Sequence, residues 1–330
     1  MIVPATDRPE TLDRCREAIE AAADAPEEVV VVETPVGATP AEARNTGALL
    51  TSADVLVFLD ADVLVALDVF TRIRAAFASD PSLTGLFGSY DDAPTDATTV
   101  SRFRNLLTHH VHQSGAGPAT TFWSGLGAIR RRRFMAVDGF DPRRRYLEDI
   151  ELGMRLAEAG DRVRLDPGLL CKHLKVWTLP GMVRTDLLRR GAPWTGLLFE
   201  RRCSSTALNL AWRHRVSAAA SVLVLGAVGA RRPLPGGAAV VAIAVLNRRF
   251  YRLLWARGGP RLALPGLGLH LVHHLTSVAA IPVGIATVAL SAGRPAPGRG
   301  PAVAVSGPAA GPRRDIAQPR SGRRPTSLRA

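Results

Sequence analysis

The chain has 330 residues and a formal net charge of +13, and this length is enough for one large domain plus an additional region. Residues 293–330 contain eight Arg and one acid, so more than half of the excess charge lies in a Pro/Gly/Arg-rich tail that we expect to be disordered. The charge therefore does not indicate a nucleic-acid partner. The cysteines fit neither a metal site nor an even set of disulfides, and we expect reduced thiols at Cys15, Cys171 and Cys203.

Apolar runs alternate with amphipathic segments over residues 1–90. After the short opening run IVPA, the pattern predicts helices at 9–23, 41–52 and 65–79, and buried strands at 27–33, 53–62 and 83–90. This alternation predicts an α/β fold with a Rossmann-like, mostly parallel sheet and helices on both faces. Ligands of such sheets bind beyond the carboxyl ends of the strands, where Glu33, Asp60 and Asp62 fall.

The run FLDADV places two aspartates inside an apolar stretch. If the strand continues through them, Asp60 and Asp62 point to one side and Ala61 to the other. Two adjacent buried carboxylates need a cation or a proton. The alternative is chance, because the composition alone predicts roughly one D-x-D in a chain of this length.

Residues 98–114 are predicted to be helical and carry His109, His110 and His112, which are candidate metal ligands or packing residues. TFWSGLGAIRRRRF follows, with Trp123 and Gly125 on a strand edge of small residues. Its four arginines open a helix, and they form either a phosphate or lipid patch or a solvated face.

A second acidic cluster lies in YLEDIELGMRLAEAG, where Glu148 and Asp149 fall in the first turn of a predicted helix that stops at Gly160. Compensation of the helix dipole is the alternative explanation for these acids. The run KHLKVW follows the strand-like RVRL and contains His173 and Trp177.

Three apolar segments, at 216–230, 234–247 and 262–292, indicate a membrane-associated region. Only the last exceeds the roughly 20 residues that span a bilayer; the first two suggest a short hairpin, and core helices of a soluble domain are the alternative. The positive-inside rule predicts a cytosolic loop between the second and third segments, because it contains Arg248, Arg249, Arg252, Arg257 and Arg261. No secretory signal opens the chain, so we expect the N-terminal domain in the cytoplasm. The expected organisation is a domain at 1–205, a membrane-associated helical region at 206–292 and the tail at 293–330.

Eight segments, taken in order along the chain, together resemble glycosyltransferase family 2, the inverting enzymes of the GT-A fold. They are VPATDRPETL, VVVVE, GATPAEARNTGA, FLDADV, FWSGLGAIRR, DGFD, LEDIELGMRL and KHLKVWTL. The resemblance covers about residues 1–200. It implies transfer from a nucleotide-diphosphate sugar, and the apolar C-terminal region points to a lipid-linked or membrane-proximal acceptor. Glu33 departs from the Asp that the family usually has, and the first strand is short.

The resemblance also implies roles for individual residues. It assigns Asp149 as the general base, with Glu148 as its acceptor-side partner. A divalent cation, Mg²⁺ or Mn²⁺, is expected on Asp62, Asp60 and His173. The nucleotide sugar is expected on Pro4, Thr6, Glu33, Arg44 and Asp60. Apart from the resemblance, the rings of Trp123 and Trp177 are able to stack on a sugar, with core packing as the alternative, and we expect the acceptor near Trp123, Gly125 and Trp177.

Elementary chemistry supports these roles, because a departing diphosphate needs a cation and an attacking hydroxyl needs a base. We therefore predict a membrane-bound, metal-dependent, inverting glycosyltransferase that faces the cytoplasm. KHLKVW differs from the Q-x-x-R-W signature of processive synthases, which favours transfer of a single sugar. A glycosidase is disfavoured for two reasons. Hydrolysis needs an acid on the leaving oxygen, and it has no use for the nucleotide crevice that the α/β pattern predicts. The alternative is a membrane-anchored protein that binds a nucleotide sugar or glycan without turnover.

Overall fold

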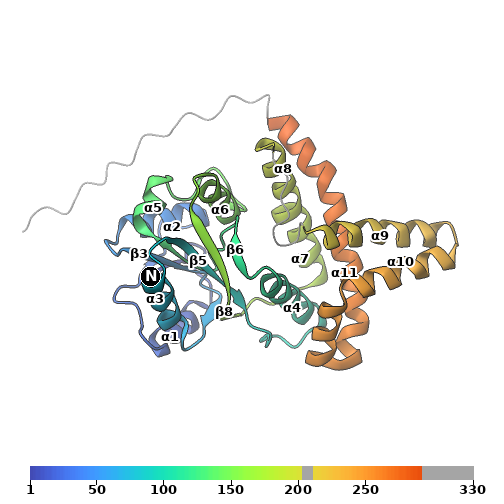
Figure 1. Cartoon of the computed structure of the whole chain (residues 1–330), viewed down its shortest axis with the longest axis horizontal. Coiled ribbons are helices and arrows are strands. Elements are labelled where there is room, and N and C mark those ends of the chain that lie inside the picture. The colour runs from blue at the N-terminus through green and yellow to red at the C-terminus, as the bar shows by residue number, and fades with distance from the viewer. Residues whose placement is uncertain (203–210, 292–330) are drawn as a thin grey trace, which may run out of the picture. The chain divides into compact units, whose positions relative to one another are not determined.

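Among the residues that the structure describes, an eight-stranded mixed sheet forms the centre of the N-terminal part of the chain, which is called the N-terminal domain below. The computed structural model describes residues 1–202 and 211–291 (Figure 1). Cys203, the expected boundary at 205 and the Arg-rich tail lie outside the described residues. The strands are β1 Ile2–Pro4, β2 Val30–Val32, β3 Val55–Leu59, β4 Val63–Val65, β5 Leu83–Tyr90, β6 Gly117–Ala119, β7 Leu126–Arg130 and β8 Arg162–His173.

The strand order is β2-β1-β3-β7-β5-β8-β4, with β6 paired to β8. β1, β2, β3, β5 and β8 run in one direction, and β4, β6 and β7 run in the other. Most strands therefore point the same way, although β7 is antiparallel to both of its neighbours. The expected α/β sheet is confirmed.

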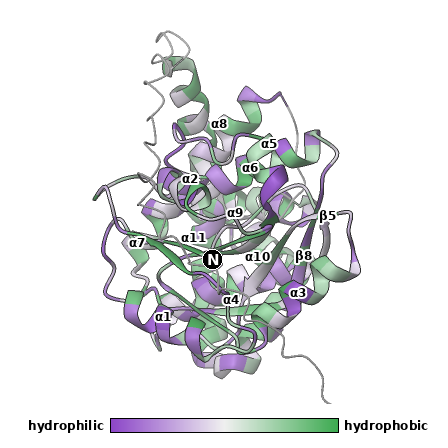
Figure 2. Cartoon of the chain, turned by 90° about the vertical axis from the view of Figure 1, so that its left-hand side faces the viewer, coloured by the Kyte–Doolittle hydropathy of each residue, from purple (hydrophilic) through white to green (hydrophobic). Residues whose placement is uncertain are grey.

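Helices cover both faces of the sheet. These helices are α1 Leu12–Ala21, α2 Pro40–Leu49, α3 Val69–Ser79, α4 Thr99–Ser114, α5 Arg131–Ala136 and α6 Glu148–Glu158. One core cluster contains the buried residues of α1 and α3, and a second contains those of α2, α5 and α6. Figure 2 shows hydrophobic and hydrophilic residues alternating along these helices, as expected for helices with one face on a sheet.

The strand predicted at 27–33 is shorter and less buried than expected. β2 comprises only Val30–Val32, and of these only Val32 is fully buried. The reason is its place at the edge of the sheet, where it pairs with β1 on one side. An edge strand has one neighbour fewer to cover its apolar side chains, and the sequence run does not reveal this position.

The C-terminal region is helical where it is described. Its elements are α7 Leu179–Arg184, the π-helix η1 Thr185–Gly191, α8 Ala192–Glu200, α9 Trp212–Gly229, α10 Pro233–Leu246 and α11 Arg248–Ser291. α9 and α10 form a hairpin beside α11 (Figure 1). Side chains of α4 and α11 share one apolar cluster with Trp177, so α11 packs against the N-terminal domain through α4.

The Arg-rich segment predicted as a loop after the second apolar segment is helical instead. Its five arginines lie in α11, which begins at Arg248. The only non-helical backbone inside α11 is at Gly259, with φ 58° and ψ −156°, directly before Pro260. A positive φ at glycine carries no Cβ penalty, so the chain turns at this one residue and needs no loop.

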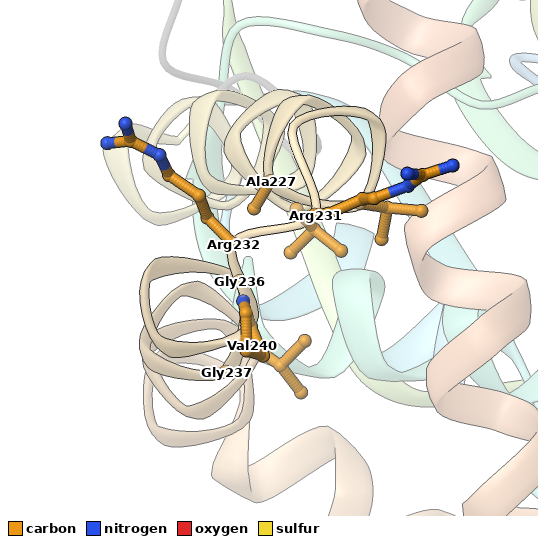
Figure 3. A pocket seen from close by; sticks show the side chains of 9 residues that line it. Ala227, Arg231, Arg232, Gly236, Gly237 and Val240 are labelled. Carbon is orange, nitrogen blue, oxygen red and sulfur yellow. The ribbon is translucent and has the colours of Figure 1, made fainter.

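One helix among the described residues, Arg248–Leu290, is long and apolar enough to cross a membrane. An open apolar pocket of about 440 Å³ lies at the turn between α9 and α10, lined by Val224, Ala227, Val240 and their neighbours (Figure 3). The side chains of Arg231 and Arg232 extend away from one another there, so their charges do not converge on the pocket (Figure 3).

Candidate active site

The carboxyl ends of β1, β2 and β3 meet at one edge of the sheet. These strands are mutually parallel, so Ala5, Glu33 and Asp60, which follow them directly, lie along the same rim. This is the position at which open α/β sheets bind ligands. The location predicted for the site is therefore consistent with the topology.

Asp60 and Asp62 do not lie on a continuous strand, so the expectation that both point to one side of a strand is wrong. β3 ends at Leu59, and the two aspartates flank Ala61 in a turn closed by a hydrogen bond from the Val63 amide to the Asp60 carbonyl at 3.2 Å. The turn forms because β4 leaves β3 and pairs with β8. As a result the two carboxylates have different partners.

Arg44 is the partner of Asp60. Its Nη2 donates to Asp60 Oδ1 at 2.6 Å, and its Nη1 donates to Glu148 Oε1 at 2.7 Å. The Arg44 side chain is only 4% exposed, and its guanidinium lies 5.6 Å from the centre of the Phe140 ring. Burial alone lowers the pKa of Arg44, but the charges of Asp60 and Glu148 raise it above its ordinary value. Arg44 therefore remains a cation between two carboxylates.

The start of α2 fixes Arg44 in this place. Thr39 accepts a hydrogen bond from the Glu42 amide, and the Glu42 carboxylate accepts one from the Thr39 amide, which makes a capping box. A Cβ on Gly47 would lie 2.4 Å from the Ile2 side chain, so only glycine lets α2 approach β1 this closely. The inward face of α2 therefore carries Arg44 onto the rim.

The Asp149 carboxylate lies at the beginning of α6. Its Oδ1 accepts from the Ile150 amide at 2.8 Å, and its Oδ2 accepts from the Ser124 amide at 3.3 Å. Burial raises the pKa of Asp149, although Arg44 and these amides oppose the rise. A carboxylate with a raised pKa is a stronger proton acceptor than a free aspartate. The raised pKa is therefore consistent with the predicted base.

Glu148, the neighbour of Asp149, is nearly buried. Burial raises its pKa to about 7, Arg44 acts in the opposite direction, and Asp149 adds to the rise. A Cβ on Gly153 would lie 2.2 Å from the Phe122 amide nitrogen, so a glycine is needed where α6 crosses the segment before Trp123. This close crossing places Glu148 and Asp149 against residues 121–125.

Asp62 faces His173, the last residue of β8. His173 Nε2 lies 3.3 Å from Asp62 Oδ2, and the Leu174 amide donates to the Asp62 carbonyl at 2.9 Å. The His173 ring stacks on Tyr90 with 4.4 Å between the ring centres. Burial favours the neutral form of Asp62, but the hydrogen bond and charge of His173, together with Lys175, lower its pKa below the ordinary value.

Comparison with known proteins finds a family to which part of this chain is similar. Residues 7–137 match the family model described as glycosyl transferase family 2. These residues are similar to that family, and for this similarity the N-terminal domain is called the family 2 domain below. Asp60, Arg44 and Trp123 lie within the matched residues of the family 2 domain, and Glu148, Asp149 and His173 follow them.

Two curated relatives of the family 2 domain are both named pre-mycofactocin glycosyltransferase. They come from Mycobacterium tuberculosis strains CDC 1551 / Oshkosh and ATCC 25618 / H37Rv, and each is 29% identical over 152 residues. The match covers 44% of this chain and 32% of the relatives, so the chain spans about a third of the length of the curated relatives it matches.

A mannosyltransferase from Pyrobaculum calidifontis, solved in complex with GDP-Man and Mn²⁺, has a similar structure. The TM-score is 0.53 at 17% sequence identity, and the match covers 86% of each chain. At this identity the likeness concerns the fold alone. The GT-A fold expected for the family 2 domain is confirmed.

The remaining predicted nucleotide-sugar residues lie around the rim. Pro4 ends β1 and pairs with Val32, and the Thr6 hydroxyl donates to the Ala38 carbonyl at 2.8 Å. Glu33 is half-exposed, with its Oε2 3.9 Å from Arg16 Nη2. Thr6 therefore holds the loop after β2 in place, while Glu33 stays accessible to a ligand.

The three predicted acceptor residues are not gathered together. The half-buried Trp123 ring meets Tyr90 and His112 at ring-centre distances of 4.9 and 5.0 Å, and a Cβ on Gly125 would lie 2.4 Å from it. Trp177 is 8% exposed and packs in the apolar cluster of α4 and α11. The structure thus places Trp123 and Gly125 beside the Asp60 turn, and Trp177 in the core.

The histidines of α4 have packing contacts. His109 Nδ1 lies 2.7 Å from the Tyr90 carbonyl, His110 packs on Phe250, and His112 packs between Phe87 and Trp123. Burial lowers the pKa of His112 to about 3, so this ring is neutral. Within residues 1–202 and 211–291, no three His, Cys, Asp or Glu side chains are close enough to hold a metal ion by themselves.

Tyr90 and Ser124 belong to the site but were not predicted from the sequence. Tyr90 ends β5 and supports the His173 ring, and Ser124 offers its amide to Asp149. Tyr90 looks like any apolar strand residue, so no sequence signal distinguishes it. Ser124 stands between the two acceptor residues singled out in FWSG, and that position was an available signal.

Proposed function

We propose that this chain transfers a single sugar from a nucleotide-diphosphate sugar to a lipid-linked or membrane-proximal acceptor, with inversion at the anomeric carbon and with Mg²⁺ or Mn²⁺ as cofactor. One observation carries the proposal. Asp60 and Glu148 both accept hydrogen bonds from Arg44, next to Asp149, in a domain similar to family 2. The names of the curated relatives, and the GDP-Man and Mn²⁺ of the structural neighbour, support the reaction class and the donor.

The donor side is the rim after β1, β2 and β3. Pro4, Thr6 and Glu33 are proposed to line the nucleotide, while Asp62 and His173, with Asp60, hold the cation. These residues fit a cation that shares its ligands with the substrate, since Mg²⁺-type sites commonly use one or two carboxylates together with phosphates. When bound, the cation would neutralise the charge that develops on the departing diphosphate.

The acceptor side is the start of α6. The Asp149 carboxylate takes the proton from the acceptor hydroxyl as the hydroxyl oxygen attacks the anomeric carbon on the face opposite the diphosphate. The new carbon–oxygen bond forms as the bond to the phosphate oxygen breaks, and the electron pair leaves with the diphosphate. Ser124, through its amide, fixes the orientation of Asp149.

The membrane-proximal acceptor is inferred from α11. Only 28% of an apolar stretch of 18 residues in this helix is buried inside the protein, whereas the core helix of a soluble protein would be mostly buried. The arginines at its start include Arg257, which pairs with Asp92 of the N-terminal domain. By the positive-inside rule these arginines belong in the cytoplasm, and we propose that the domain attached to them lies there too.

The test is release of nucleoside diphosphate by full-length protein in detergent, across UDP-, GDP- and dTDP-sugars, with and without Mn²⁺ or Mg²⁺, with membrane lipid extract as acceptor source. We expect metal-dependent release from one donor and a loss of about 10²–10⁴-fold in Asp149→Asn. Glu158→Gln, at the exposed far end of α6, is the matched control and should retain activity.

Two outcomes would contradict the proposal. Equal turnover in Asp149→Asn would remove the base assignment. Donor binding in thermal-shift measurements without release in any acceptor extract would instead support a membrane-anchored binding protein.

A further inference from the structure

Arg44 joins carboxylates from two separate parts of the site. Asp60 follows β3 on the donor side, and Glu148 opens α6 on the acceptor side; Arg44 donates to both, at 2.6 and 2.7 Å. We propose that Arg44 is a positioning residue that ties these two carboxylates together and does not itself contact the donor. This inference rests on the proposed function, and it differs from the nucleotide-binding role predicted from the sequence.

The burial of Arg44 supports this role. Its side chain is 4% exposed, the Phe140 ring lies against the guanidinium, and Nε is buried without a hydrogen-bond partner in the described part of the chain. Both Nη atoms are already used by carboxylates. The N–H groups that remain are enclosed with the rest of the buried side chain, so a donor phosphate would have to open this packing to reach Arg44, which makes direct contact unfavourable.

The local charge balance points the same way. Arg44 is the cation among Asp60, Glu148 and Asp149, and these carboxylates act on its charge. If all three are ionised, the group carries a net negative charge even with Arg44 in place. Such a group attracts a divalent cation and repels a bare phosphate, so Arg44 offsets internal repulsion and does not offer a free positive charge to the donor.

Loss of Arg44 should make the stability of the protein depend more strongly on pH. Two charged groups act on Glu148, Arg44 from α2 and Asp149 from α6, and Asp60 from the turn after β3 acts on both Arg44 and Asp149. Burial raises the pKa of Glu148 and Arg44 lowers it, so removing Arg44 should raise this pKa further. A raised carboxylate pKa makes folding less favourable as pH rises toward it.

The experiment compares Arg44→Gln, Arg44→Lys and the double variant Arg44→Gln/Glu148→Gln with the wild type, all as full-length protein in detergent. The matched control is Arg133→Gln. Arg133 makes a two-bond pair with Asp161 at the amino-terminal edge of the sheet, where β5 and β8 begin. Arg133→Gln removes a partly exposed arginine–carboxylate pair from the same domain, away from the rim.

The first readout is thermal unfolding at pH 5.5 and pH 8, which needs no turnover. We expect Arg44→Gln to lower Tm more at pH 8 than at pH 5.5, because the unpaired buried Glu148 must then carry a charge. Adding Glu148→Gln should remove most of the additional loss of Tm at pH 8. Arg133→Gln should lower Tm equally at both pH values. The inference would be overturned if Arg44→Gln lowered Tm by the same amount at both pH values and the added Glu148→Gln did not restore Tm.

The second readout separates positioning from donor binding. We expect kcat to fall about 10²-fold in Arg44→Gln with donor KM nearly unchanged, and Arg44→Lys to recover part of kcat because it keeps the charge but not the two-pronged geometry. A rise in donor KM with unchanged kcat would show direct donor contact and overturn the inference. If the wild type turns over no donor, the proposed function fails, and the unfolding readout still decides the role of Arg44.

Discussion

Asp62 and His173 meet because β4 pairs antiparallel with β8, in a register that sets Val63 opposite His173. The pairing leaves 3.3 Å between Asp62 Oδ2 and His173 Nε2, and the Tyr90 ring stacked on His173 holds the imidazole in place. A carboxylate and an imidazole held side by side provide two donor atoms for a cation before any substrate binds.

We therefore expect His173→Gln to weaken Mn²⁺-supported donor binding by about tenfold or more, whether His173 ligates the ion or orients Asp62. Calorimetry measures this change while Mn²⁺ is titrated into the protein at a fixed donor concentration. His109→Gln is the control, since His109 lies at the Tyr90 carbonyl and not at Asp62. If His109→Gln weakens Mn²⁺ binding and His173→Gln does not, the metal site belongs to α4.

The elements that the sequence predicts well are those whose environment is uniform along their length. β5 is buried at every position of Leu83–Tyr90, so its apolar run and its burial coincide. α6 is amphipathic throughout and begins with Glu148 and Asp149 in its first turn, as predicted. In both, local pattern and tertiary environment agree, so the pattern is sufficient.

The failures have a common physical cause, which is pairing between distant residues. Arg44 meets Asp60 and Glu148, which lie 16 and 104 residues away in sequence, and no local pattern marks these contacts. The turn at Asp60 and Asp62 depends likewise on β4 choosing β8 as its partner. Residue types predict carboxylates at the rim, but they do not predict the arrangement of its charges.

Gly125→Ala should disturb the rim through Trp123. A Cβ at position 125 would lie 2.4 Å from Trp123 Cζ2, so the indole must move away from Tyr90 and His112. We expect a destabilisation of about 1–3 kcal/mol, measured by thermal unfolding. We also expect diphosphate release to fall by more than the fraction of protein that this destabilisation unfolds.

Gly85→Ala is the matched control for Gly125→Ala. It lies in β5, where the new Cβ would meet Val163 at an ordinary 3.4 Å. Comparable losses in both variants would mean that Gly125 matters only for packing and that Trp123 has no part in the reaction.

Asp186→Ala should strongly destabilise the contact between the N-terminal domain and α11. Asp186 Oδ1 forms an ion pair with Arg104 Nη2 at 2.7 Å, Asp186 Oδ2 accepts from Arg104 Nη1 at 3.4 Å and lies 2.8 Å from His273 Nδ1, and all three side chains are buried. Removing the carboxylate leaves Arg104 as a buried unpaired cation, which typically costs about 3–5 kcal/mol. Unfolding of detergent-solubilised protein measures the change.

Two comparisons make the Asp186 prediction specific. Asp68→Asn breaks an exposed pair with Arg72 and should cost at most about 1 kcal/mol. The double variant Arg104→Met/Asp186→Leu removes both charges and should recover much of the loss. A double variant as unstable as Asp186→Ala would show that shape, and not the unpaired charge, determines the stability.

The final prediction concerns the membrane. Ile281 and Ile285 of α11 are 48% and 43% exposed, in the apolar part of the helix after the Gly259 turn. If this part lies in the bilayer, each Asp there costs about 2.5–3.5 kcal/mol, so Ile281→Asp/Ile285→Asp should shift protein from carbonate-washed membranes to the supernatant. Leu67→Asp places the same charge at an exposed leucine of the N-terminal domain and should not change the membrane fraction. Retention of the double variant in the pellet would show that α11 is not the anchor, and wild-type protein in the supernatant would contradict membrane attachment altogether.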